Sequence, residues 1–354
     1  IPSDESVPSL ILFLEKGQQG YDIVAASGDL SDIARASMSL LSAGKEEEAR
    51  SWFLLLKKLD GSDSRLPNLS GFSFLSGLEP SKASAEELKR AAALILCSSS
   101  DAEDSKLGSS VIYPFWKAST EEEWKKAKAA DLALGLLRAG DAERGLEVAG
   151  YLYEKNKTDL RAAEVYGFAL EVSGRSGEGD EIAKAGIARG GSSVGDWKRL
   201  LARRLAGRGS YDEALDILAS LFPAGQAAKG DYNNIAWYSL YTKKGLPPDF
   251  VDKYAIVKRL SSGSDAEIHT LVCFLAAQGR LSDARELFER YVNIPAKSDA
   301  LVCERLAYAF LAEGFGLDDC ARRYYDGALK KDILYPGLSV GALAEYRLRN
   351  MNSK

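Results

Sequence analysis

The sequence is poor in the residues that most often carry chemistry. Its 354 residues include one histidine, four cysteines and ten prolines. A single histidine excludes a histidine-rich metal site and leaves one candidate for histidine-based catalysis. No apolar run reaches the roughly 18 residues of a membrane-spanning helix. The hydrophobic content of 46% excludes a disordered chain and is enough for a substantial core.

The four cysteines lie far apart inside apolar helical stretches, and none forms a CxxC pair. This spacing favours buried small hydrophobic residues over a disulfide framework or a metal site. We therefore expect no metal and no cofactor. The four cysteines are Cys97, Cys273, Cys303 and Cys320.

The charge balance is slightly acidic, with 46 Lys and Arg against 51 Asp and Glu, or a formal net charge of −5. A protein that binds a nucleic-acid duplex normally presents a basic face, so nucleic acid is disfavoured as a partner. The sharpest basic cluster, residues 198–208, is offset by Asp196, Asp212 and Glu213.

Glycine is abundant, with 32 residues, and several glycines recur at a regular interval. Each of these follows an apolar helical run and precedes a second amphipathic run. Glycine ends a helix at low cost because it adopts the left-handed conformation easily. The spacing therefore predicts helix pairs joined at Gly140, Gly174, Gly209, Gly245, Gly279 and Gly314, which are 34, 35, 36, 34 and 35 residues apart.

Small residues recur where the two helices of each pair would cross, which allows their backbones to approach closely. On the first helices they are Ala133, Gly167, Ala202, Ala236, Val272 and Ala307. On the second helices they are Gly145, Gly179, Ala214, Ala284 and Cys320. The copy at Gly245 continues with Pro247-Pro248, so its second helix is expected to be skewed.

The copy "LVCFLAAQGRLSDARELFERYVNIP", with Gly279, Ala284, Phe288 and Pro295, resembles the tetratricopeptide repeat (TPR), a helix–turn–helix unit of about 34 residues. The resemblance implies an all-α, right-handed superhelical solenoid of antiparallel helix pairs. It covers residues 120–330 as a regular array. Residues 1–97 are predicted to hold a leading helix and partly degenerate repeats at Gly44 and Gly77, residues 98–119 an inserted loop, and residues 331–354 a C-terminal capping helix or tail.

A second resemblance concerns the stretch "GDYNNIAWYSLY" followed by "DAEIHTLVCFLAAQGRLSDARELFERYV". It is similar to the C-terminal repeats of large bacterial envelope proteins, in which a transglutaminase-like domain precedes a TPR tail. The resemblance favours the bacterial periplasm, whereas unpaired cysteines favour a reducing compartment. Because the sequence begins at Ile1 without a signal peptide, we expect a processed piece whose targeting sequence lies outside it.

Catalysis is not predicted. His269 and Cys273 are four residues apart and share a helix face, but no neighbouring sequence provides an oxyanion site. The glycine-rich stretch "SGRSGEGDE" lacks the preceding strand and the lysine of a phosphate-binding loop.

In TPR proteins the first helices line a concave groove, at positions three before and one after the small crossing residue. Here these positions are Ala130, Leu134, Glu164, Phe168, Arg199, Arg203, Asn233, Trp237, His269, Cys273, Glu304 and Tyr308, with Tyr241 one turn beyond Trp237. Arginine and aromatic side chains often anchor ligands. The predicted partner-binding residues are therefore Arg199, Arg203, Asn233, Trp237, Tyr241, His269, Glu304 and Tyr308; packing between repeats is the alternative for Trp237, and an ordinary polar lining for His269.

A second candidate surface is the aromatic group Ile112, Tyr113, Phe115 and Trp116, which either packs back onto the array or meets a partner. The sequence as a whole predicts a non-catalytic TPR scaffold that binds a peptide or protein in its groove. The alternatives are an accessory domain of a larger exported enzyme, transglutaminase-like or hydrolase, and a structural spacer.

Overall fold

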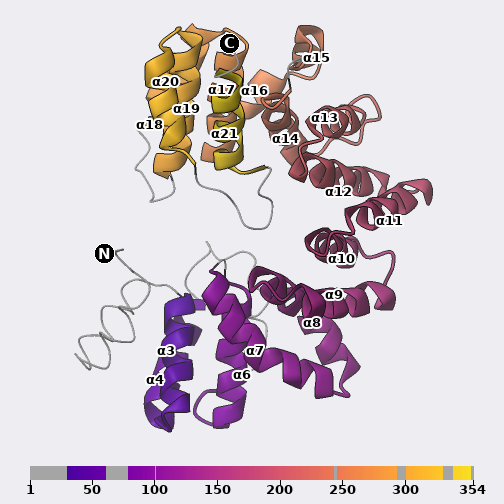
Figure 1. Ribbon diagram of the computed structural model, residues 1–354, viewed down its shortest axis with the longest axis vertical. Coiled ribbons are helices and arrows are strands. Elements are labelled where there is room, and N and C mark those ends of the chain that lie inside the picture. Colours follow the sequence, from indigo (N-terminus) through magenta and orange to yellow (C-terminus); the bar gives the residue numbers. More distant parts are fainter. Residues whose placement is uncertain are drawn as a thin grey trace. The chain divides into compact units, whose positions relative to one another are not determined.

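The computed structural model describes residues 30–60, 79–99, 101–242, 245–292, 300–329 and 338–351. Within these ranges the regular elements are α-helices, arranged as successive hairpins (Figure 1). The chain divides into two compact units, Ile1–Gly179 and Asp180–Lys354, each with its own buried core. None of the described helices is both long enough and apolar enough to cross a membrane.

The first unit consists of helix pairs that stack through their first helices. α6 packs against α3 on one side and α8 on the other, and α10 follows α8. Its helices are α3 (Leu30–Ser42), α4 (Glu46–Asp60), α6 (Ala85–Cys97), α7 (Ala102–Ala118), α8 (Glu122–Arg138), α9 (Ala142–Lys155) and α10 (Leu160–Val172).

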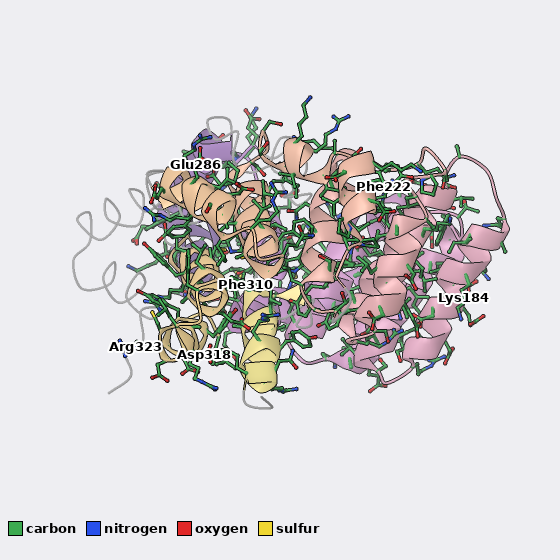
Figure 2. All side chains as sticks on the ribbon, turned by 90° about the horizontal axis from the view of Figure 1, so that it is seen from above. Lys184, Phe222, Glu286, Phe310, Asp318 and Arg323 are labelled. Carbon is green, nitrogen blue, oxygen red and sulfur yellow. The ribbon has the colours of Figure 1, made fainter. Side chains whose placement is uncertain are left out.

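The second unit continues the same plan from α11 (Ser176–Ala188), which begins just before the boundary. Its first helices α14, α17 and α19 pack side by side. Charged side chains on its surface point outward, as those of Lys184, Glu286, Asp318 and Arg323 do (Figure 2). The helices are α12 (Val194–Gly207), α13 (Tyr211–Ala219), α14 (Lys229–Ser239), α15 (Pro248–Lys253), α16 (Ile256–Leu260), α17 (Asp265–Ala277), α18 (Leu281–Val292), α19 (Ala300–Gly314), α20 (Asp318–Asp326) and α21 (Val340–Met351).

Five of the six predicted turn glycines are confirmed by their left-handed φ angles, which lie between 61° and 88°. The sixth turn residue is Gly316, at φ 73°, and not Gly314. Gly314 lies in the last turn of α19, where an added Cβ would come within 2.3 Å of Leu281 Cδ2. Glycine at 314 therefore serves close packing inside the helix, and α19 ends two residues later than predicted.

This shift also corrects the crossing residue on α20. In the pairs that turn at Gly140, Gly174, Gly209 and Gly279, the small residue lies five positions after the glycine, as Gly145 and Ala284 do. Counted from Gly316, that position is Ala321, which is fully buried, whereas Cys320 is half-buried. The predicted small residues on the first helices are all buried, and so is Gly145, whose close neighbour is Leu137 of α8.

The predicted inserted loop at residues 98–119 is wrong, because residues 102–118 form helix α7. The Asp101 side chain caps it by accepting a hydrogen bond from the Asp104 backbone N–H at 2.9 Å. α7 packs on α6 so closely that a Cβ on Gly108 would lie 2.4 Å from the carbonyl oxygen of Ala93. α6 and α7 are therefore a helix pair, and the sequence pattern missed it because no glycine marks the described part of their turn.

It follows that α6 is a first helix, stacked on α3, and not the second helix of a repeat at Gly77. Gly77, Pro295 and the predicted leading helix in the first twenty residues lie outside the described residues. The skew expected after Gly245 is confirmed. The second helix there is split into α15 and α16, with Ala255 in the left-handed region at φ 50° between them.

Two glycines of α11 provide a test of this packing. A Cβ at Gly186 would lie 2.1 Å from Cδ2 of Trp197, whose side chain is buried, whereas a Cβ at Gly177 would meet nothing within 4 Å. We expect Gly186→Ala to lower the free energy of unfolding by about 1–3 kcal/mol through overpacking. Gly177→Ala should raise it by about 0.5–1 kcal/mol, because alanine favours the helix. Urea denaturation of both variants measures this, and equal effects would contradict the contact between α11 and α12.

Candidate functional site

Arg199, on α12, is held by acidic neighbours within the second unit. Its Nε lies 2.9 Å from each carboxylate oxygen of Asp231, and its Nη1 donates to Asp196 at 2.7 Å. Asp231 is buried at the start of α14, and its hydrogen bonds raise the pKa of Arg199. The guanidinium therefore joins α12 to α14, and its charge is neutralised before any ligand arrives.

Arg203 and Asn233 are both half-buried, one turn from Arg199 and from Trp237 respectively. The Oδ1 atom of Asn233 is buried and has no hydrogen-bond partner among the residues that the structure describes. A buried polar atom without a partner costs free energy, so a ligand that donates a hydrogen bond to this Oδ1 would remove that cost and bind more tightly.

Trp237 and Tyr241, on and just after α14, contact a distant part of the chain near its C-terminal end. Trp237 Nε1 donates to the backbone oxygen of Leu338, and the Tyr241 hydroxyl donates to that of Ser339, both at 3.1 Å. The two side chains thus donate to successive carbonyl oxygens of one stretch of main chain. We call residues 338–351 the C-terminal segment.

Tyr241 is also enclosed by other aromatic rings. It stacks on Tyr211 at 4.1 Å between ring centroids and lies 5.7 Å from Tyr346 of α21. Its side chain is 3% exposed, and burial raises its pKa. The prediction that Tyr241 extends an open stripe is therefore wrong, because the C-terminal segment covers it.

α21 is further anchored through Arg347. This guanidinium donates to Glu313 of α19 through Nη2 at 2.6 Å and Nε at 3.1 Å, and it lies 5.1 Å from the centre of the Phe310 ring. Glu313 also accepts from the Tyr325 hydroxyl at 2.8 Å. These contacts form a buried acidic socket for one basic side chain.

The C-terminal segment therefore does not simply extend the stack as a cap on its end. In a solenoid each repeat contacts only its neighbours. The segment instead contacts α14, α19 and α20, although α17 stands between α14 and α19. It thus crosses the face formed by the first helices of this unit, which we call the concave face.

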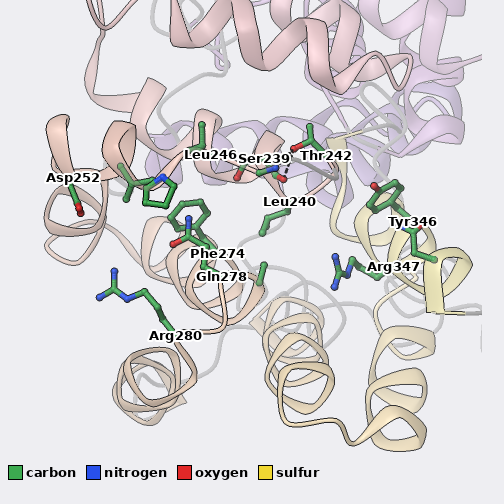
Figure 3. Close-up of a pocket in the computed structure, with 15 residues that line it drawn as sticks. Ser239, Leu240, Thr242, Leu246, Asp252, Phe274, Gln278, Arg280, Tyr346 and Arg347 are labelled. Carbon is green, nitrogen blue, oxygen red and sulfur yellow. Dashed lines mark hydrogen bonds between the residues drawn. The ribbon is translucent and has the colours of Figure 1, made fainter. Parts of the chain in front are cut away.

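A cavity of about 920 Å³ remains between α21 and the C-terminal ends of α14 and α17 (Figure 3). Its lining mixes apolar and polar side chains, and no charge of one sign dominates it. Examples are Phe274, Gln278 and Arg280 from the α17 end, Asp252 from α15, and Tyr346 and Arg347 from α21.

His269 and Cys273 of α17 do touch, with Nε2 and Sγ 3.8 Å apart, but both are buried. Burial lowers the pKa of His269 to about 4 and raises that of Cys273 above its ordinary value. A general base works best when its pKa lies near neutral pH, and a nucleophilic thiol must lose its proton to react. The pair meets neither requirement and is unsuited to catalysis. The prediction that His269 lines an open groove is wrong, because the residue is 4% exposed and its ring lies 5.9 Å from that of Trp237.

Glu304 and Tyr308 show the effect of the misplaced turn. Glu304 is half-buried, and Tyr308 packs against second helices, 4.2 Å from Phe288 of α18 and 5.2 Å from Tyr324 of α20. When positions are counted from Gly316, the residue of α19 that follows the small one is Phe310, which is the ring beneath Arg347. The stretch "EGFG" contains two glycines, Gly314 and Gly316, and taking the second as the turn residue would have predicted Phe310 at this position.

In the first unit the predicted groove residues of α8 and α10, namely Ala130, Leu134, Glu164 and Phe168, are all half-buried. The second candidate surface packs back, because Tyr113 and Trp116 are 8% and 3% exposed. Lys125 Nζ covers the Trp116 ring at 4.7 Å. In the part of the chain that the structure describes, no three His, Cys, Asp or Glu side chains gather as metal ligands would.

Because His269 is the chain's single histidine, its burial predicts a clean pH effect. Its folded pKa of about 4 lies below the unfolded value near 6.5, so the stability present above pH 6.5 is lost as the pH falls towards 4. When the pH is lowered from 7.5 to 5, the free energy of unfolding of the wild type should fall by about 2 kcal/mol more than that of His269→Gln. Urea denaturation at both pH values measures this, and parallel losses would show that His269 is solvated.

No protein-family model matches the chain, and no curated protein matches it significantly. Among solved structures, a human IFIT1 dimer with m7Gppp-AAAA is similar at 14% identity and a TM-score of 0.47, covering 92% of this chain and 83% of that one. The TPR domain of P58(IPK) is similar at 12% identity and a TM-score of 0.25, covering 98% of both chains. These values are too low to carry an argument. The helix pairs, the glycine turns and the stacked first helices themselves make the described chain a TPR-like α-helical solenoid.

Proposed function

We propose that the protein is a non-catalytic scaffold that binds a peptide or protein on the concave face of its second unit. The observation that supports this is the pair of hydrogen bonds from Trp237 and Tyr241 to successive main-chain carbonyls. Side chains that donate to main-chain carbonyls can hold a peptide whatever its sequence, and pockets alongside then supply specificity.

Nucleic acid is not the proposed partner. The most prominent arginine of the face, Arg199, is paired with Asp231 and Asp196, and the net charge of the chain is −5. Binding to phosphates requires unneutralised basic groups, because it draws its free energy from releasing counterions. An accessory domain of a larger exported enzyme stays the alternative prediction.

The proposal is tested by reversing charge and removing the aromatic anchor on this face. Arg203→Glu combined with Trp237→Ala should lose most partners that the wild type captures from a lysate, as measured by quantitative mass spectrometry. The reason is that both changes fall on one face, which is the proposed contact surface.

Lys184→Glu is the matched control for the charge, because Lys184 lies on the exposed side of α11, where it pairs with Glu181 of the same helix. It should capture the same partners as the wild type. If the double variant keeps its helical circular dichroism and captures an unchanged set, the concave face is not the binding site.

A further inference from the structure

The concave face of the second unit is already occupied by the chain's own C-terminal segment. The segment enters at α14, where Trp237 and Tyr241 bind the carbonyls of Leu338 and Ser339. It then forms α21, which Ser339 caps by accepting from the Ala342 N–H at 3.1 Å. It ends at α20, where Arg322 donates to the carbonyl of Met351 at 3.1 Å.

We propose that the C-terminal segment is an intramolecular ligand of this face. The partner that the face takes is then a helix-forming peptide with an arginine at the place of Arg347, which displaces the segment when it binds. The inference rests on the proposed function, because it names the class of peptide that the same face would bind.

The segment is positioned by polar contacts at defined points, which is the first argument. Its apolar side chains also pack on this unit, since Leu343 and Met351 are buried in the core and Tyr346 and Leu348 pack partly against it. The directional contacts are the main-chain hydrogen bonds from Trp237 and Tyr241 and the ion pair to Glu313. These are the features that a competing peptide has to reproduce to take the place of the segment.

The second argument is the incomplete fit. The 920 Å³ pocket lies beside α21, and its lining includes Tyr346 and Asn350 of α21 together with Phe274 and Gln278 from the end of α17. It opens to solvent, since Gln278 and Arg280 are exposed, and α21 leaves this surface space unfilled. A partner with larger side chains at these two positions would fill the cavity and gain contacts that α21 lacks.

The third argument is the socket for a basic side chain. Glu313 is 11% exposed in its side chain and receives the Arg347 fork, with Phe310 beneath the guanidinium. Without a cation the carboxylate would be buried with only the Tyr325 hydroxyl as its described donor, so the socket selects peptides that carry one. Arg347 lies eight residues after Ser339, which fixes the arginine about 12 Å along the helix from the main-chain contacts.

The test uses the full chain with a protease recognition sequence inserted directly after Leu329, which is 47% exposed. After cutting, a fluorescently labelled synthetic peptide of residues 338–351 is added, and its binding is followed by fluorescence anisotropy. The peptide should replace the severed segment in the cut chain. It should bind the uncut chain at least about tenfold more weakly, because a tethered competitor acts at high effective concentration.

Two variant peptides test the arginine. A peptide with Arg347→Glu should bind the cut chain at least about tenfold more weakly than the native peptide, since it places a carboxylate against Glu313. A peptide with Arg349→Glu is the matched control, because the Arg349 side chain is 75% exposed and its ion-pair partner, Glu345, lies on the same helix. It should bind as the native peptide does.

Three results would overturn the inference. The cut chain could stay helical without taking up the peptide, or it could lose helical circular dichroism on cutting, which would make α21 part of the core. The two variant peptides could also bind alike. The peptide exchange does not depend on any external partner, so it can be told apart from the capture experiment. If the peptide exchanges as expected but the double variant captures unchanged proteins, the proposed binding of partners is wrong. The proposal that the C-terminal segment is a ligand of this face would then still stand.

Discussion

Most of the described helix pairs depend on a close crossing of two backbones. In the pairs that turn at Gly140, Gly174, Gly209, Gly279 and Gly316, a left-handed glycine reverses the chain and a small residue follows five positions later. At Gly145 the neighbouring Leu137 is so near that a methyl group would have no room. This constraint sets the helix lengths and the angle between them, and so decides which residues of the first helix remain for the concave face.

The same constraint explains how far the sequence was informative. The repeat period rests on local residues, so the turns from Gly140 to Gly279 and the crossings beside them were predictable without any coordinates. The pair of α6 and α7 was missed because a serine-rich turn replaces the glycine, and Pro114 obscures the helical pattern. At α19 two glycines competed, and only the packing of Leu281 distinguishes their roles.

The site was predictable only in part, for a different physical reason. Helix geometry predicts Trp237 in the groove, but its hydrogen-bond partner Leu338 lies 101 residues away in the chain. No periodicity encodes a contact between such distant segments. The burial of Tyr241 and His269, and the socket formed by Glu313 and Phe310, all depend on packing of this long-range kind.

The scarcity of histidine has a practical consequence. One imidazole in 354 residues gives a single set of ring resonances in a proton NMR spectrum. That ring lies 5.9 Å from the indole of Trp237, the same side chain that binds the C-terminal segment. The magnetic field of an aromatic ring changes sharply with distance and tilt. The chain therefore carries a built-in, label-free spectroscopic reporter of whether its own groove is open or filled.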